Sequence, residues 1–299
     1  MCAKTVIIIT GPTAAGKTEL SLAVARHFNT SIISADSRQC FRELNIGVAK
    51  PSPEELNLVK HEFINSHGIQ EEVNAALFES LSLQWAGEIF KKQDVLVMAG
   101  GTGLYLKAFC EGLDPIPPAD EQLRIEIREQ YQLNGLGWLR EKIKRCDPEF
   151  YQSGETANPQ RMMRALEVME STGRSILSFR DAPGKTRPFR ILRFGIRVPT
   201  AILYRRINDR VDRMMELGLL EEVHSLLSFQ HLNALQTVGY TELFEYLNGN
   251  SDLPEAVRRI KQNSRHYAKR QMTWFRKDPE IRWLEENRLQ EILQYFGEA

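Results

Sequence analysis

Short apolar runs that alternate with amphipathic stretches set the pattern of the first third of the chain. The run 6–9 is continuously apolar, and residues 19–28 after it carry apolar side chains at helical spacing. The runs 31–35 and 94–99 repeat the pattern of a buried strand followed by a polar or glycine-rich turn. Because strands that alternate with helices favour a parallel sheet covered on both faces, the sequence predicts an α/β fold with a doubly wound parallel sheet.

The pattern changes after a proline-rich stretch at 115–118 and becomes helical and charged as far as residue 187. Its clearest helix starts with Asn158 as the N-cap and Pro159 at the first helical position, and it ends at Gly173. Residues 190–198 alternate and return to the sheet. The sequence therefore predicts three parts: an α/β core over 1–118, a helical insertion over 119–187, and the rest of the core with a basic C-terminal helix over 188–299.

Composition narrows the class of protein. The 299 residues include 42% hydrophobic ones, enough to bury a full core, and the 39 Lys and Arg balance the 39 Asp and Glu. The four cysteines have no metal-ligand or disulfide spacing, and neither a cleavable leader nor an apolar run of membrane-spanning length is present. These features predict a soluble cytoplasmic protein that meets any nucleic acid through local patches.

A phosphate-binding loop of the form GxxxxGK[ST] follows the first strand. In such a loop the backbone N–H groups surround an anion, the lysine adds a positive charge and the last hydroxyl can ligate Mg²⁺. The helix that follows directs the positive end of its dipole at the same anion. The expected fold is therefore P-loop NTPase-like, and the loop residues are Gly11, Pro12, Thr13, Ala14, Ala15, Gly16, Lys17 and Thr18.

Two further polar residues follow strand ends and should lie near this loop, because ligands gather at the carboxyl ends of parallel strands. Asp36 follows the second strand, and Thr102 lies in the glycine turn after the strand 94–99. Asp36 could be a general base, a partner of a metal ligand or a helix cap. The third strand ends in Met98 and Ala99 instead of the Asp that usually helps to hold Mg²⁺, so ATP hydrolysis is not favoured.

Three basic helical faces admit two interpretations each. Gln160, Arg161 and Arg164 share one face, Arg210 lies on a helix rich in arginine, and residues 258–277 mix cations with aromatic side chains. Each face could be a solvated surface or could bind phosphate groups and bases. Spacing alone does not choose between them.

Eight ordered motifs resemble those of the tRNA dimethylallyltransferase (tRNA isopentenyltransferase) family over nearly the whole chain. They are GPTAAGKT at 11–18, DSRQ at 36–39, NIGVAKP at 45–51, AGGTGLY at 99–105, NPQRMMRALEV at 158–168, RINDRVDRMMELGLLEEV at 206–223, QTVGYTEL at 236–243 and YAKRQMTWFRK at 267–277. The chain lacks the zinc-finger extension of eukaryotic relatives, which favours the bacterial type.

The resemblance implies transfer of the dimethylallyl group from dimethylallyl diphosphate to N6 of adenosine 37, on the 3′ side of the anticodon in tRNA, with release of diphosphate. It implies that Lys17, the loop amides and Mg²⁺ held with Thr18 bind the diphosphate and that Arg210 adds to this clamp. It also implies that Asp36 accepts the amine proton, that Thr102 lines the base site, and that the partner of a monomeric enzyme is the tRNA anticodon stem-loop.

The resemblance also implies that the insertion 119–187 binds tRNA, and the tRNA contacts that it implies come from six segments of the chain. They are Asp36, Ser37, Arg38 and Gln39; Thr102; Arg124; Gln160, Arg161, Met162, Met163 and Arg164; Gln236, Thr237, Val238, Gly239, Tyr240 and Thr241; and Lys269, Arg270, Gln271, Met272, Thr273, Trp274, Phe275 and Arg276.

Three positions depart from the family pattern, namely Ala15, Phe41 and Thr241, and none of them removes a proposed catalytic group. Competing hypotheses are a small-molecule kinase that uses the loop for ATP, a non-catalytic RNA-binding module, and an enzyme that alkylates a free adenine nucleotide. The kinase accounts only for the first forty residues, and the free nucleotide would not require the basic aromatic helix.

Overall fold

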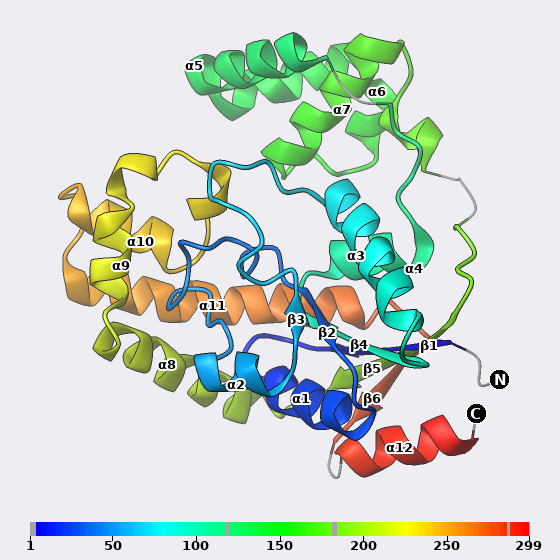
Figure 1. Cartoon of the computed structure of the whole chain (residues 1–299). Helices are drawn as coiled ribbons and strands as arrows, with labels where there is room; N and C mark the ends of the chain where they lie inside the picture. Colours follow the sequence, from blue (N-terminus) through cyan, green and yellow to red (C-terminus); the bar gives the residue numbers. More distant parts are fainter. Residues whose placement is uncertain (1–3, 118–119, 181–183, 286–287, 299) are drawn as a thin grey trace. The chain divides into compact units, whose positions relative to one another are not determined.

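The computed structural model describes the chain except residues 1–3, 118–119, 181–183, 286–287 and 299 (Figure 1). By its contacts the chain divides into two units, one formed by Met1–Glu111 with Thr186–Ala299 and the other by Gly112–Lys185. The boundary expected at 118–119 lies outside the described residues. The division of function between the predicted domains stays a prediction.

A six-stranded sheet in which every neighbouring pair is parallel forms the centre of the larger unit. Its strand order is β3-β2-β4-β1-β5-β6. The α/β parallel fold predicted from the alternating pattern is thus confirmed. The strands are β1 (Thr5–Thr10), β2 (Ile32–Ala35), β3 (His61–Glu62), β4 (Val95–Gly100), β5 (Arg190–Ile196) and β6 (Ile281–Leu284).

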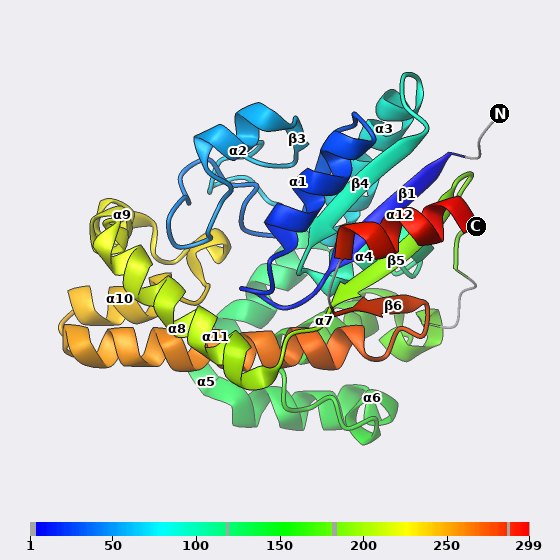
Figure 2. The same ribbon diagram turned by 90° about the horizontal axis from the view of Figure 1, so that it is seen from below.

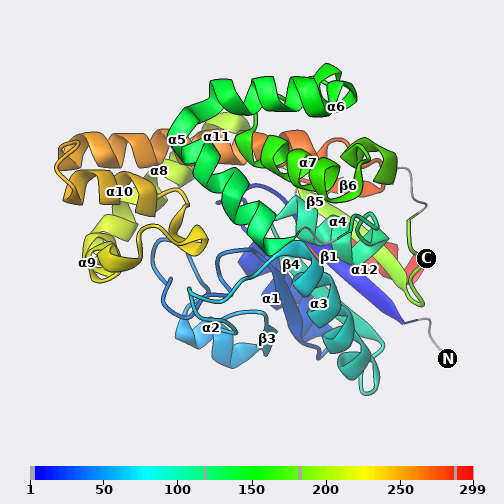
Figure 3. The same cartoon turned by 90° about the horizontal axis from the view of Figure 1, so that it is seen from above.

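Helices cover both faces of this sheet. On one face α1 (Lys17–His27) and α12 (Arg288–Glu298) pack through a cluster that joins Val24, Phe194 and Ile292, and Figure 2 shows both helices on the near side. The opposite face carries α3 (Ala75–Phe90) and α4 (Gly103–Glu111), as Figure 3 shows. Since β1 and β4 are buried over nearly their whole length, they need apolar residues facing both ways.

The remaining helices of this unit include the longest of them, α11, which packs on several others. The long helix α11 contacts α8, α10 and α4. These helices are α2 (Pro53–Leu58), α8 (Thr200–Glu216), α9 (Leu219–Ser225), α10 (Tyr240–Leu247) and α11 (Leu253–Phe275), with short 3₁₀ turns at Leu227–Phe229 and Asn233–Leu235. None of the helices in the described part of the chain has the length and apolar character needed to span a bilayer.

The unit Gly112–Lys185 is helical around its own core. It contains α5 (Glu121–Cys146), α6 (Pro148–Gln152), α7 (Pro159–Thr172) and the 3₁₀ turn Ile176–Phe179, and a kink divides α5 at Gly135. Asn158 caps α7 by accepting from the N–H groups of Gln160 and Arg161, and Gly173 ends it in the left-handed conformation. The predicted limits of this helix are confirmed.

Candidate functional site

The loop between β1 and α1 forms a hook closed by its own lysine. Lys17 Nζ donates to the carbonyl oxygens of Gly11 at 3.0 Å and Pro12 at 2.8 Å. An ammonium group has three N–H donors, so one is left for an anion in the hook. Burial lowers the pKa of Lys17 to about 8; the charge of Asp36 partly offsets this effect and that of Arg210 adds to it. An incoming anion would restore the charged form.

Two side chains from distant helices hold the same loop. Arg210 of α8 donates from Nη1 to Thr13 Oγ1 at 2.9 Å, and burial lowers the pKa of its guanidinium. Gln271 of α11 accepts from the Thr13 N–H at 2.9 Å and donates to the Gly101 carbonyl at 2.9 Å. A Cβ at residue 101 would come within 2.2 Å of the Gln271 amide nitrogen, so a side chain there would displace this amide. Gln271 therefore connects the loops that follow β1 and β4.

Asp36 begins a tight turn at the end of β2. Its Oδ1 accepts from the N–H groups of Arg38 at 2.9 Å and Gln39 at 3.3 Å, which is the local cap expected of an Asp at a strand end. Thr102 Oγ1 accepts from the Ser37 N–H at 3.1 Å. Thr102 thus holds the turn, and the second carboxylate oxygen of Asp36 remains for another partner.

A cavity of about 960 Å³ is lined by Lys17, Asp36, Arg210 and Gln271, whereas Thr102 is not among its described lining residues. The lining comes from the loop after β1 and the start of α1, the turn after β2, α8, α10 and α11, which the sequence separates by more than two hundred positions. Of the predicted residues it is lined by Thr13, Ala14, Ala15, Gly16, Lys17, Thr18, Asp36, Ser37, Arg38, Gln39, Arg210, Gln236, Thr237, Val238, Gly239, Thr241, Arg270 and Gln271. The predicted neighbourhood of Lys17, Asp36 and Arg210 is present.

Several side chains within the predicted tRNA-contacting segments face the interior instead. Met162 and Met163 belong to the core of the helical unit, and Tyr240 and Phe275 are buried in the larger unit. These four side chains therefore pack in the core, because a helix that presents one face to a ligand turns the next residues inward. Contact of their segments with tRNA stays a prediction. Gln271 is also buried and uses both ends of its amide within the protein.

The predicted arginines of the helical unit form ion pairs within that unit. Arg164 Nη1 lies 3.1 Å from the buried carboxylate of Glu167, and Arg124 Nε lies 3.6 Å from the same oxygen. Arg161 pairs with Glu155 at 3.3 Å. Both interpretations of this basic face stay open, since a paired arginine can still donate to phosphate with its other N–H groups.

The basic residues of α11 fall into two groups. In its first half Arg258 pairs with Glu255, Arg259 with Glu245 and Lys261 with Asp212. In its second half a second cavity, of about 390 Å³, is lined by His266, Lys269, Arg270, Thr273, Trp274 and Lys277.

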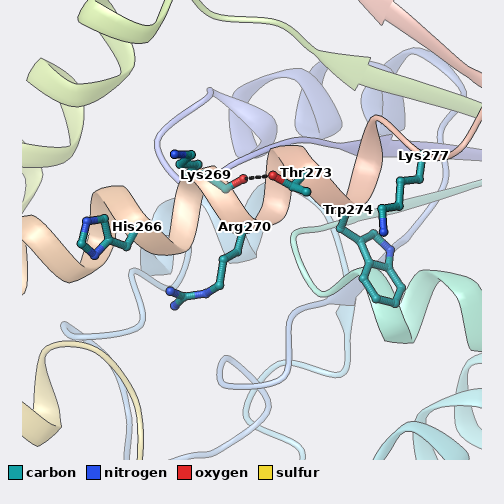
Figure 4. A pocket seen from close by; sticks show the side chains of 6 residues that line it. All are labelled: His266, Lys269, Arg270, Thr273, Trp274 and Lys277. Atoms are coloured by element: carbon teal, nitrogen blue, oxygen red, sulfur yellow. Dashed lines mark hydrogen bonds between the residues drawn. The ribbon is translucent and has the colours of Figure 1, made fainter. Parts of the chain in front are cut away.

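The second half of α11 exposes its cations beside an aromatic ring. Figure 4 shows Arg270 and Trp274 projecting from the same side of the helix, and Trp274 is 40% exposed. No described carboxylate pairs with Lys269, Arg270 or Lys277. This half of the helix therefore presents cations and an indole together to solvent.

Sequence reasoning missed part of the cavity wall. The segment 47–51 lines the cavity together with Arg206, Glu242 and Asn263, and none of these had been given a role. Glu242 accepts from the Gly239 N–H at 2.8 Å and from Asn263 Nδ2 at 2.7 Å. The signal for 47–51 was available, since the NIGVAKP motif was visible, but its glycine and apolar residues carry no chemistry of their own.

A metal ion at this site would be held mainly by the phosphate oxygens of a bound substrate. No three His, Cys, Asp or Glu side chains among the described residues could hold an ion together. Thr18 offers one hydroxyl where α1 begins, beside the phosphate hook. Mg²⁺ usually keeps several waters and binds phosphate oxygens with few protein ligands, so this donor set fits a magnesium ion that arrives with a diphosphate.

The sequence of this chain matches known proteins over most of its length. The family model described as IPP transferase matches residues 39–278. A relative named tRNA dimethylallyltransferase 1, from Bacteroides thetaiotaomicron, is 46% identical over 292 residues, which cover 98% of this chain and 95% of the relative.

Two solved structures also align with nearly the whole chain. The tRNA isopentenylpyrophosphate transferase of Bacillus halodurans aligns with a TM-score of 0.73 and 34% identity, over 99% of this chain and 96% of the other. A eukaryotic dimethylallyltransferase whose structures are described as acting on tRNA aligns with a TM-score of 0.75 over 95% of this chain and 74% of the other. At 24% identity the latter supports the fold alone.

Proposed function

The chain belongs to the IPP transferase family, and we propose that it is a transferase that moves the dimethylallyl group of dimethylallyl diphosphate to N6 of adenosine 37 in tRNA. The observation that carries this proposal is the joint placement of Lys17, Arg210 and Asp36 on one cavity. An anion cradle and a carboxylate that share a cavity suit a reaction with an anionic leaving group and an acidic proton to remove.

The diphosphate would occupy the hook of the 11–18 loop. The free N–H of Lys17, the loop amides and the positive end of α1 stabilise the charge that grows on the leaving group. Arg210, already fixed on Thr13, presents further N–H donors to the same oxygens. Both cations are half-buried, so water screens them less than it would on the open surface.

Mg²⁺ bound by the diphosphate and Thr18 would neutralise further charge on the leaving group. Thr18 supplies one neutral hydroxyl, and the protein's own contribution is to direct the diphosphate so that its bond to the dimethylallyl carbon faces the Asp36 side of the cavity. Magnesium, cytoplasmic location and a monomeric state are parts of this proposal.

Asp36 would receive the amine of the adenine. The N6 lone pair forms the new bond to the first carbon of the dimethylallyl group, the carbon–oxygen bond breaks, and diphosphate departs with the electron pair. The proton released from N6 passes to the Asp36 oxygen that the turn leaves free. Thr102 holds the turn through Ser37 while this happens.

Transfer RNA would be bound by exposed residues. The adenine must be unstacked to reach a cavity, and single-stranded loops allow this at low cost. Lys269, Arg270 and Trp274 supply charge and a stacking surface on α11. Gln160 and Arg161, exposed on the helical unit, are further candidates for RNA contact.

The test is incubation of the purified protein with dimethylallyl diphosphate, Mg²⁺ and unmodified tRNA, followed by mass analysis of the nucleosides. We expect the mass of one adenosine to rise by one dimethylallyl group. ATP and free AMP serve as parallel substrates. Phosphate transfer from ATP, or alkylation of AMP in preference to tRNA, would overturn the proposal.

A further inference from the structure

Three consecutive backbone N–H groups converge on one carboxylate beside the cavity. Glu222 of α9 accepts from the N–H of Asn45 at 3.1 Å and of Ile46 at 2.8 Å through Oε2, and from that of Gly47 at 3.1 Å through Oε1. Successive N–H groups that point to one place form a concavity for an anion. In this protein the anion is a side chain that the sequence places 175 positions away from Gly47.

Tyr240 completes the arrangement from the opposite side. Its hydroxyl donates to Glu222 Oε1 at 2.5 Å, and the side chain is fully buried. Burial and the carboxylate together raise the pKa of this hydroxyl, so it stays a proton donor at physiological pH. Gly47 lies directly on the ring, where a Cβ would come within 2.5 Å of a ring carbon. The loop can reach Glu222 only because residue 47 has no side chain.

The other end of the same loop holds the side chain of Gln39. The Gln39 amide donates to the carbonyl oxygens of Val48 at 3.3 Å and Ala49 at 3.1 Å. Its oxygen accepts from Ser34 Oγ at 3.2 Å. The backbone N–H of Gln39 is one of the two donors to Asp36 Oδ1. A continuous chain of hydrogen bonds therefore runs from Glu222 through the 45–49 loop to the turn that carries Asp36.

We propose that Glu222, supported by Tyr240, is a positioning residue that sets the orientation of the Asp36 carboxylate through the 45–49 loop and Gln39. Neither Glu222 nor Tyr240 is among the described residues that line the cavity, so both act through others. The inference rests on the proposed function, because it assigns Asp36 the role of proton acceptor. The 11–18 loop, where the diphosphate would bind, is held by a separate set of bonds that join Arg210 and Gln271 to Thr13.

This separation defines the kinetic signature. Glu222→Gln keeps the size of the side chain but replaces an acceptor oxygen by an NH₂ group, which faces N–H donors. Misplacement of a catalytic group by about 1 Å can cost about 100-fold in rate, so we expect kcat to fall about 100-fold. The KM for dimethylallyl diphosphate should stay within about twofold of the wild-type value. Glu221→Gln, at the exposed neighbouring position on α9, is the matched control and should retain the wild-type kcat.

Tyr240→Phe provides a second, milder variant. It leaves the three backbone bonds to Glu222 and removes only the hydroxyl, so we expect a fall in kcat of about tenfold or less. If Glu222→Gln does not fold, an unchanged kcat in Tyr240→Phe would overturn the proposal. An unchanged kcat in a folded Glu222→Gln variant, or a rise in donor KM equal to the loss of kcat, would overturn the proposal.

Hydrogen exchange gives a readout that does not depend on activity. In Glu222→Gln we expect faster exchange of the amides of residues 38, 39 and 45–47, with the 11–18 loop unchanged. Equal exchange in both segments would contradict the proposed chain of bonds. If the wild-type protein transfers no dimethylallyl group, the proposed function fails, and the exchange experiment still determines whether Glu222 holds the turn.

Discussion

The loop of residues 11–18 and Arg210, together called the cradle from here on, gather cations, and so does the second half of α11. The two regions differ in how far water reaches those cations. In the cradle, Lys17 is enclosed enough for burial to lower its pKa to about 8, and both Lys17 and Arg210 are bonded to the loop itself. On α11, Lys269 and Arg270 lie exposed to solvent. In the proposed function, the first region would hold a small, dense anion and the second a long polyanion.

The difference predicts two kinds of energetics. Enclosed charges are poorly screened, so each one contributes strongly and depends little on salt. Exposed charges act within a Debye length of about 8 Å at physiological salt and add up in small steps. Removal of one charge should therefore lower activity strongly in the cradle and weaken tRNA binding only slightly on α11.

The largest effect is expected at the carboxylate that faces the cradle. Asp36→Asn keeps an oxygen that can accept from Arg38 and Gln39, so the turn persists while the proton acceptor is lost. We expect kcat to fall by about 10² to 10⁴-fold. Filter binding should give a tRNA affinity close to that of the wild type, and a variant with full turnover would remove Asp36 from the reaction.

Loss of the cradle lysine should come next. In Lys17→Ala the leaving group loses one enclosed cation, and we expect kcat/KM for dimethylallyl diphosphate to fall by about 10² to 10³-fold. The loss should be nearly the same at low and high salt, in contrast to any α11 variant. A loss that disappears in high salt would show that Lys17 behaves as an exposed charge.

A change of pH should act on the cradle and leave the exposed cations charged. Burial lowers the pKa of Lys17 to about 8, so its ammonium loses its proton as the pH rises through this value. The Kd of inorganic diphosphate should then rise by up to about tenfold per pH unit above 8. Calorimetry in buffers of different ionisation enthalpy should detect proton uptake on binding. Lys17→Arg, which stays charged, should flatten the profile, and a wild-type Kd that is constant from pH 7 to 9.5 would contradict the assignment.

The smallest effects belong to α11. Lys269→Ala and Arg270→Ala should each raise the Kd for tRNA several-fold and lower the slope of log K against log salt by about 0.7 to 0.9. The matched control is Lys261→Ala on the first half of the same helix, where the charge is paired with Asp212. If Lys261→Ala changes the salt slope as much as Lys269→Ala, the distinction between the two halves of α11 is lost.

Most of the fold followed from local pattern. Strands β1 and β4 are apolar runs, β5 alternates, and Asn158, Pro159 and Gly173 mark the ends of α7 with side-chain and backbone chemistry. The short strands β3 and β6 were not predicted, because two or four residues pair through backbone groups and leave little periodicity to recognise. Helix α12 was missed as well, although its apolar residues complete the core over α1.

The site was predictable where a residue carries its own chemistry. Lys17, Asp36 and Arg210 were named from motif and charge, and the cavity brings them together. The sequence did not reveal that Gln271 and Glu222 hold distant loops, because an amide or carboxylate that bonds a backbone far away looks like any other polar residue in sequence. The ranges predicted for RNA contact were contiguous, so they also included the inward-facing Met162 and Phe275.

The connectivity of the sheet has a consequence for synthesis of the chain on the ribosome. The central strand β1 emerges first, but one of its two neighbours is β5, which begins only at Arg190, and the loop after β1 is braced by Gln271. Domains generally fold as they emerge from the N-terminus, yet the bond from Thr13 to Gln271 cannot form until α11 has been translated. A nascent chain therefore carries the phosphate motif for most of its elongation without this brace.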